Sequence, residues 1–143
     1  MQAALEQAKK AVLTNEVPVG AVVVNEYGII VGSGYNQVEH EHTQAAHAEM
    51  QALAQAGVYK KDWRLMWHWL YVTLEPCQMC MGLVRLSRLA GIVYGAQSPL
   101  FGYGVDNHLA SSVYKKDAFI VISGIEEEKA QAQLLQFFKK NRK

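Results

Sequence analysis

One histidine, one glutamate and two cysteines stand at spacings that suit metal chemistry. His47 and Glu49 are two residues apart, and Cys77 and Cys80 follow later in the run PCQMC. An imidazole and two thiolates are ligands that zinc favours, and a zinc held by three protein groups keeps a fourth tetrahedral position for water. Glu49 is close enough to a ligand to carry that water's protons. The four residues therefore predict a hydrolytic zinc centre.

Other interpretations of these residues stay open from the spacing alone. A CxxC pair that follows a strand and opens a helix is also typical of thioredoxin-like redox proteins. A purely structural zinc would need a fourth ligand, for which the remaining histidines are the candidates: His40, His42, His68 and His108. A zinc-binding subunit without activity is a third alternative, but such a subunit gains nothing from a carboxylate beside the metal.

The composition is that of a single globular domain over residues 1–143. Half of the 143 residues are hydrophobic and 19% are charged, which separates the chain from disordered sequences. The formal net charge of +1 excludes the strong field of a protein that coats nucleic acid nonspecifically, so any such contact must be local. The one basic cluster, over residues 139–143, also fits a solvated helix end.

Nothing in the sequence indicates export or membrane insertion. Residues 1–10 lack the apolar core and cleavage site of a signal peptide, and no segment is apolar for long enough to span a bilayer. Two cysteines at CxxC spacing fit the reducing cytoplasm, where such pairs do metal or redox work. We therefore expect a cytoplasmic protein with no membrane partner.

The elements that must position the site alternate between helix and strand. Apolar periodicity predicts helices over residues 2–14, 45–56, 77–87 and 126–140. Runs rich in β-branched residues predict strands over residues 19–24, 29–35, 70–74, 92–94 and 119–123. This order predicts an α/β fold, a three-layer α-β-α sandwich with a mixed five-stranded sheet.

Details of these elements bear on the site. Gly57 is expected to end the second helix, which puts His47 and Glu49 in its first turn. Cys77 and Cys80 are expected one turn apart on the next helix, where both sulfurs can reach one ion. The closing helix is expected to bury an apolar stripe made of Ala130, Leu134, Leu135 and Phe138.

The combination of His47, Ala48 and Glu49 with the run 76–80 resembles the zinc-dependent cytidine deaminase superfamily. More of the chain is similar to its bacterial tRNA-specific adenosine deaminases: VPVGA at 17–21, Asn36, LYVTLEPC at 70–77, Ser87 with Arg88, VYGA at 93–96 and FFK at 137–139. The resemblance implies the cytidine deaminase-like fold and hydrolytic deamination of adenosine to inosine at the wobble position (position 34) of a tRNA anticodon, with release of ammonia.

The same resemblance implies roles for individual residues and partners. His47, Cys77 and Cys80 would bind one Zn²⁺ per subunit, and Glu49 would be the proton shuttle. Asn36 would recognise the base, and Val17 and Ala48 would line its pocket. The partners implied are the tRNA anticodon stem-loop and a second copy of the chain in a homodimer.

Two segments depart from the family's pattern. Residues 99–106 read PLFGYGVD where the family has a Lys-Thr-Gly type of loop, and residues 43–45 read TQA in place of Asp-Pro-Thr. Both segments flank the RNA cleft of the family. The alternative function is therefore deamination of a free nucleobase or nucleoside, such as guanine, cytosine or cytidine.

Overall fold

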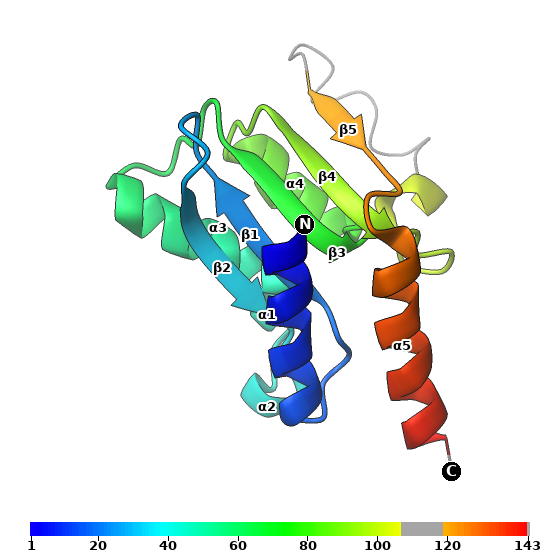
Figure 1. Cartoon of the computed structure of the whole chain (residues 1–143). Helices are drawn as coiled ribbons and strands as arrows, with labels where there is room; N and C mark the ends of the chain where they lie inside the picture. Colours follow the sequence, from blue (N-terminus) through cyan, green and yellow to red (C-terminus); the bar gives the residue numbers. More distant parts are fainter. Residues whose placement is uncertain (107–118, 143) are drawn as a thin grey trace.

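In a computed structural model the chain forms a mixed five-stranded sheet between two layers of helices (Figure 1). The structure describes residues 1–106 and 119–142. The strands are β1 (Gly20–Val24), β2 (Ile30–Tyr35), β3 (Trp69–Leu74), β4 (Gly91–Ala96) and β5 (Ile120–Ile122). The helices are α1 (Gln2–Leu13), α2 (Val38–Glu41), α3 (Ala48–Lys60), α4 (Gln78–Leu86) and α5 (Glu127–Asn141). Single 3₁₀ turns cover Gln44–Ala46 and Tyr103–Asp106.

The strand order is β2-β1-β3-β4-β5. The predicted hairpin pairs β1 with β2, and β1 is also antiparallel to β3, whereas β3, β4 and β5 run parallel to one another. Helix α4 connects β3 to β4. Because these two strands are parallel, their carboxyl ends lie at the same edge of the sheet. The carboxyl end of β3 leads directly to the cysteines.

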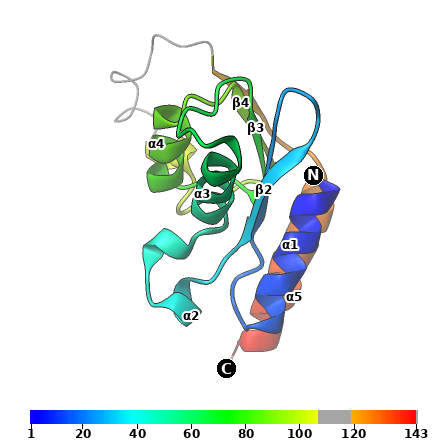
Figure 2. The same ribbon diagram turned by 90° about the vertical axis from the view of Figure 1, so that its left-hand side faces the viewer.

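Two helical layers enclose the sheet, which confirms the predicted three-layer sandwich. Figure 2 shows α1 and α5 side by side on one face and α3 with α4 on the other. The larger core lies on the α3 and α4 side, where fully buried Val23, Leu70 and Ile92 of the sheet pack with residues of both helices. A smaller cluster around Leu5 and Ala130 seals the opposite face.

Glycines in β2 let helix α3 approach the sheet closely. A Cβ atom on Gly32 would overlap the carbonyl oxygen of Ala52, and one on Gly34 would overlap the carbonyl oxygen of Ala48. Only glycine leaves room for the helix backbone at these points. The first turn of α3, which carries Glu49, is thereby pressed against the end of β2.

Three predicted details of the helices are wrong. Helix α3 starts at Ala48, after a 3₁₀ turn, and continues through Gly57 to Lys60. Residues 38–41 form the short helix α2, which was not among the predicted helices. In α5 the buried residues are Ala130 and Phe137, with Leu134 partly buried, while Leu135 and Phe138 are 70% and 49% exposed.

None of the helices in the described ranges is both long and apolar enough to cross a membrane.

Candidate metal centre

Two helix starts bring the three predicted ligands together. His47 is the residue that precedes the first turn of α3, and Cys77 takes the same position on α4, with Cys80 in that helix's first turn. The amino ends of both helices, with their unpaired N–H groups, meet after the carboxyl end of β3, because the donor atoms of His47, Cys77 and Cys80 lie close together. The expectation that His47 and Cys77 lie within the helices is corrected by one residue in each case.

The donor atoms have the spacing of a zinc site. Nδ1 of His47 lies 3.5 Å from Sγ of Cys80 and 3.8 Å from Sγ of Cys77, and all three donors lie within 4.8 Å of one another. Tetrahedral zinc ligands at about 2.3 Å for sulfur and about 2.0 Å for nitrogen are roughly 3.5 Å apart. The nitrogen and the two sulfurs therefore fit one Zn²⁺.

No fourth ligand joins this cluster within residues 1–106 and 119–142. His40 pairs with Glu41, and His68 is buried beside Met66 and Glu26. His42 is exposed and does not join the donor cluster. His108, the last candidate for a closed structural site, lies outside the described residues. Three ligands leave a position for solvent, which is the arrangement of catalytic rather than structural zinc sites.

Gln44, which the sequence analysis did not select, orients the histidine. Its Oε1 lies 3.0 Å from Nε2 of His47. An amide oxygen only accepts, so Nε2 donates the hydrogen bond and Nδ1 is left to face the sulfurs. The contact spans three residues and depends on the 3₁₀ turn over Gln44–Ala46, which no sequence signal predicted.

The donors change one another's pKa. Hydrogen bonding from Cys80, aided by His47, lowers the pKa of Cys77 to about 4. The same contact with Cys77, together with burial, raises the pKa of Cys80 above its ordinary value. Hydrogen bonding to Cys77 raises the pKa of His47. Zinc binding must therefore displace protons from this cluster, and zinc affinity falls as the pH falls.

Glu49 lies close enough to the three donors for its charge to act on them, and it is nearly sealed from solvent. Its residue is 4% exposed, in the first turn of α3. Burial raises the pKa of its carboxyl group, while a backbone hydrogen bond and the charge of His47 act in the opposite direction. A buried carboxyl group whose pKa is raised and which lies beside a metal site is suited to accept a proton from water.

The three residues expected to contact the substrate are placed differently from one another. Asn36 directly follows β2, is 9% exposed, and donates a hydrogen bond from Nδ2 to the buried carboxylate of Glu16. Val17 is partly buried in the segment before β1, and its carbonyl oxygen accepts from the N–H of Val19. Ala48 directly follows His47, and its side chain is fully buried in the main core.

Glu75 anchors the segment that departs from the family's pattern. Its two carboxylate oxygens accept the N–H groups of Ser98 and Gly104, each at 3.0 Å. Tyr103 adds a hydrogen bond from its N–H to the carbonyl oxygen of Pro76. The described part of this loop, up to residue 106, is therefore tied to the two residues that precede Cys77.

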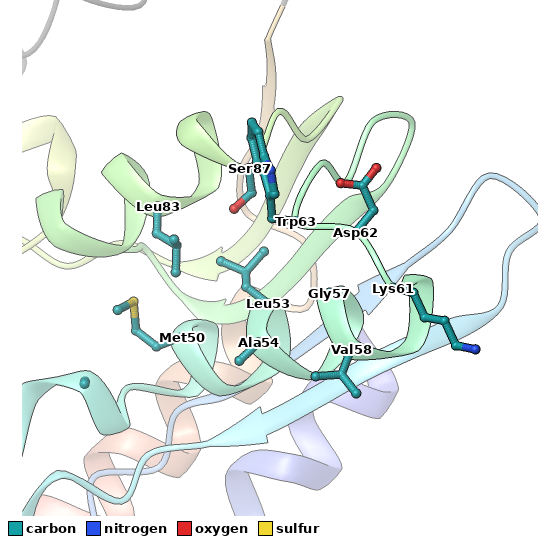
Figure 3. A pocket seen from close by; sticks show the side chains of 11 residues that line it. Met50, Leu53, Ala54, Gly57, Val58, Lys61, Asp62, Trp63, Leu83 and Ser87 are labelled. Carbon is teal, nitrogen blue, oxygen red and sulfur yellow. The ribbon is translucent and has the colours of Figure 1, made fainter.

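A separate apolar groove runs between α3 and α4 (Figure 3). Its volume is about 730 Å³, and its walls include Met50, Leu53, Val58, Trp63 and Leu83. None of the metal-site donors lines it. The groove is a surface of the molecule distinct from the metal centre.

The site and the fold agree with comparisons to known proteins. Residues 1–96 match the family described as "Cytidine and deoxycytidylate deaminase zinc-binding region", and the chain belongs to this family. Together with the N/S₂ donor cluster, this membership confirms the predicted zinc cofactor, one ion per subunit.

Several relatives have related names. The chain is 41% identical to the "tRNA-specific adenosine deaminase" of Bacillus subtilis (strain 168), over all of this chain and 89% of that protein. It is 42% identical over 107 residues to the protein of the same name from Streptococcus pyogenes serotype M1, covering 75% of this chain. Against that protein's own length, the matched region spans only 61%.

A solved structure extends the similarity to three dimensions. It comes from a study of "A-to-I Editing by tRNA:A34 Deaminases at the Wobble Position of Transfer RNA" and matches with a TM-score of 0.85 at 34% identity. The match covers 94% of this chain and 97% of that chain. The predicted cytidine deaminase-like fold is thereby confirmed.

Proposed function

We propose that this chain is a zinc-dependent hydrolase that deaminates adenosine to inosine at wobble position 34 of a tRNA anticodon. The observation that carries the chemistry is the buried carboxyl group of Glu49 beside a cluster of one nitrogen and two sulfur donors with no fourth ligand in the described chain. Support for the substrate comes from the names of relatives that are about 41% identical, one of them along the whole chain.

The residues of the site can perform the steps of this reaction. His47, Cys77 and Cys80 hold the ion, which when bound supplies a Lewis acid that activates water. Glu49 takes a proton from the attacking water and returns it to the departing amino group, so ammonia leaves and the purine carbon keeps the oxygen. Because burial raises the pKa of Glu49, its carboxylate accepts this proton more readily than an exposed carboxylate would.

The same proposal assigns the substrate contacts. Asn36 binds the base edge and Val17 contributes to the wall around it, while Ala48, whose side chain is buried, supports that wall from the core side. The anticodon loop suits this site because its bases are single-stranded and leave their stack at a low energetic cost. The domain of residues 1–143 acts on tRNA in the cytoplasm.

The experiment is a reaction of the zinc-loaded protein with a tRNA pool, followed by sequencing for inosine. Ammonia release from adenosine, guanine, cytosine and cytidine is measured in parallel. Inosine at position 34 is expected. Modification confined to the free bases or nucleosides would overturn the tRNA assignment and favour the alternative function.

The role of Glu49 is tested with Glu49→Gln, which keeps the size of the side chain. Zinc content is expected to stay at one per subunit while turnover falls by about 10²- to 10⁴-fold, the usual contribution of a general acid–base. Glu128→Gln, an exposed carboxylate in α5, is the matched control and is expected to be neutral. Unchanged turnover in Glu49→Gln would remove the proposed proton shuttle.

We propose further that two copies form a homodimer through the α3 and α4 face. This face carries the apolar groove, and α4 also exposes Met79 and Leu86, which are 40% and 55% accessible. Large apolar groups gathered on one face mark an interaction surface. Sedimentation at several concentrations is expected to show a dimer that Leu86→Glu weakens. Leu135→Glu, at an exposed position on α5, is the control, and equal effects of the two changes would refute this interface.

A further inference from the structure

Glu16 is a buried acidic residue to which neither the family resemblance nor the proposed reaction gives a role. It is 1% exposed. Its Oε1 accepts the backbone N–H of His40 at 2.7 Å, and its Oε2 accepts Nδ2 of Asn36 at 3.3 Å. Buried carboxylates are costly unless they are fully hydrogen-bonded, so this one must contribute something that an apolar residue cannot.

The end of helix α1 places Glu16 in the interior. Asn15 adopts a left-handed backbone conformation, with φ of 58°, and its N–H donates to the carbonyl oxygen of Val12. The N–H of Glu16 donates to the carbonyl oxygen of Ala11 at 2.9 Å. These two bonds form a Schellman motif, in which asparagine is a suitable left-handed residue. The chain reverses there and turns the Glu16 side chain toward β2.

Asn36, the partner of Glu16, lies next to the metal centre. The N–H of Gln37 donates to the carbonyl oxygen of Ala46, the residue directly before His47. The N–H of Asn36 donates to the carbonyl oxygen of Val19, so its backbone is fixed on both sides. The side-chain amide of Asn36 therefore has one rigid backbone position beside the proposed base pocket.

The orientation of that amide follows from the chemistry of its partner. An ionised carboxylate only accepts hydrogen bonds, so it must face the NH₂ group of Asn36 and not the oxygen. Within the described residues, Oδ1 of Asn36 has no donor, and it is not among the buried atoms that lack a partner. The oxygen is thus left accessible, while the nitrogen is held by Glu16.

We propose that Glu16 is a positioning residue that locks the side-chain amide of Asn36 and so fixes the order of donor and acceptor presented to the base. This inference rests on the proposed function, since it assigns the contact to the same pocket. Glu16 itself touches no substrate. It acts by preventing the side-chain amide of Asn36 from rotating by 180°, an orientation in which the NH₂ group would face the pocket in place of the oxygen.

Glu16→Gln tests the lock because it preserves size and burial but replaces one acceptor with a donor. The N–H of His40, the shorter contact, retains the new amide oxygen, so the new NH₂ faces Asn36 and forces its amide to flip. We expect KM for tRNA to rise about 10- to 100-fold, since a site that loses a matched polar contact discriminates strongly. Glu6→Gln, an exposed change on α1, the helix that precedes Glu16, is the control.

The reciprocal change separates positioning from a merely structural role. Asn36→Asp alone sets two carboxylates against each other and is expected to raise KM as well. In the double variant Glu16→Gln with Asn36→Asp, the new NH₂ donates to one aspartate oxygen, and the other oxygen again faces the pocket. We expect this pair to recover most of the lost kcat/KM.

The outcomes are distinguishable from failure of the proposed function. If the unaltered protein makes no inosine, the function fails irrespective of Glu16. If the unaltered protein makes inosine, two results would overturn the inference. One is a normal KM in Glu16→Gln, and the other is a loss of kcat/KM in the double variant as large as the losses of the two single variants combined. Should Glu16→Gln fail to fold, recovery of Asn36→Asp by the second change decides the question. Zinc content and melting temperature are measured for each variant, and equal values exclude a general loss of structure.

Discussion

The contact between Gln44 and His47 gives a measurable prediction about zinc affinity. In the change Gln44→Ala, Nε2 of His47 loses the acceptor that lies 3.0 Å away. Groups of this kind around metal ligands typically contribute about 10- to 100-fold in affinity. Gln44 is exposed, so water can partly replace its oxygen, and we expect the lower end, about tenfold or roughly 1.4 kcal/mol.

The assay is competition for zinc with a chromophoric chelator at fixed pH, which reports metal affinity without relying on turnover. Gln44→Glu keeps an acceptor and is expected to bind zinc as tightly as the unaltered protein. Gln131→Ala is the matched control, because Gln131 is also exposed and makes a single side-chain hydrogen bond, to Glu127. Equal affinities for Gln44→Ala and Gln131→Ala would refute the reasoning that Gln44 orients the histidine.

Two further predictions follow from the geometry. In metal-free protein the lowered pKa of Cys77, about 4, keeps its thiolate present above that pH. Alkylation of Cys77 should therefore stay fast from pH 8 to 5 and become slow near pH 4, whereas Cys80, whose pKa is raised, should react slowly throughout. Mass spectrometry of the labelled protein checks both expectations. Gly34→Ala should destabilise the fold by about 2 kcal/mol in urea unfolding, because its Cβ would meet the Ala48 carbonyl oxygen, whereas Gly82→Ala, with open space around its Cβ, should be neutral or stabilising.

The cluster of three donors could be predicted from the sequence because its information is local. The CxxC spacing and the proline before it fix a helix start, and His47 with Glu49 forms a second short motif. Each motif needs only its own helix to be formed. The convergence of the two motifs then follows from the order of strands and helices, which the sequence also indicated.

The supporting residues could not be predicted, because their partners are chosen by tertiary structure. Glu16 and Asn36 are twenty residues apart and meet only after α1 reverses and β2 pairs with β1. No spacing rule selects that contact. Gln44 is near His47 in sequence, but its contact requires a 3₁₀ turn over residues 44–46, where the sequence predicts that an α-helix begins at residue 45.

The errors in the helices have the same origin. Gly57 costs only about 1 kcal/mol inside a helix, so α3 continues past it and ends where Lys61 adopts a left-handed conformation, with φ of 57°. On α5, Phe137 and Phe138 are equally apolar, and periodicity cannot choose between them. The packing of α5 against the rest of the fold chooses Phe137, which is 9% exposed.

The anchored loop after β4 shows how this chain can differ from its family without disturbing the chemistry. Because Glu75 accepts two N–H groups of the loop, the backbone at Ser98 and Gly104 is fixed relative to Cys77 whatever side chains lie between them. Leu100 and Phe101 occupy that interval and are 76% and 77% exposed. Substitutions at these two positions change the surface offered beside the site, whereas a change at Glu75 would release the loop from the strand that delivers the metal ligands. Within this one short segment, the side chains exposed beside the site can therefore vary while the backbone contacts that position the metal-binding residues stay the same.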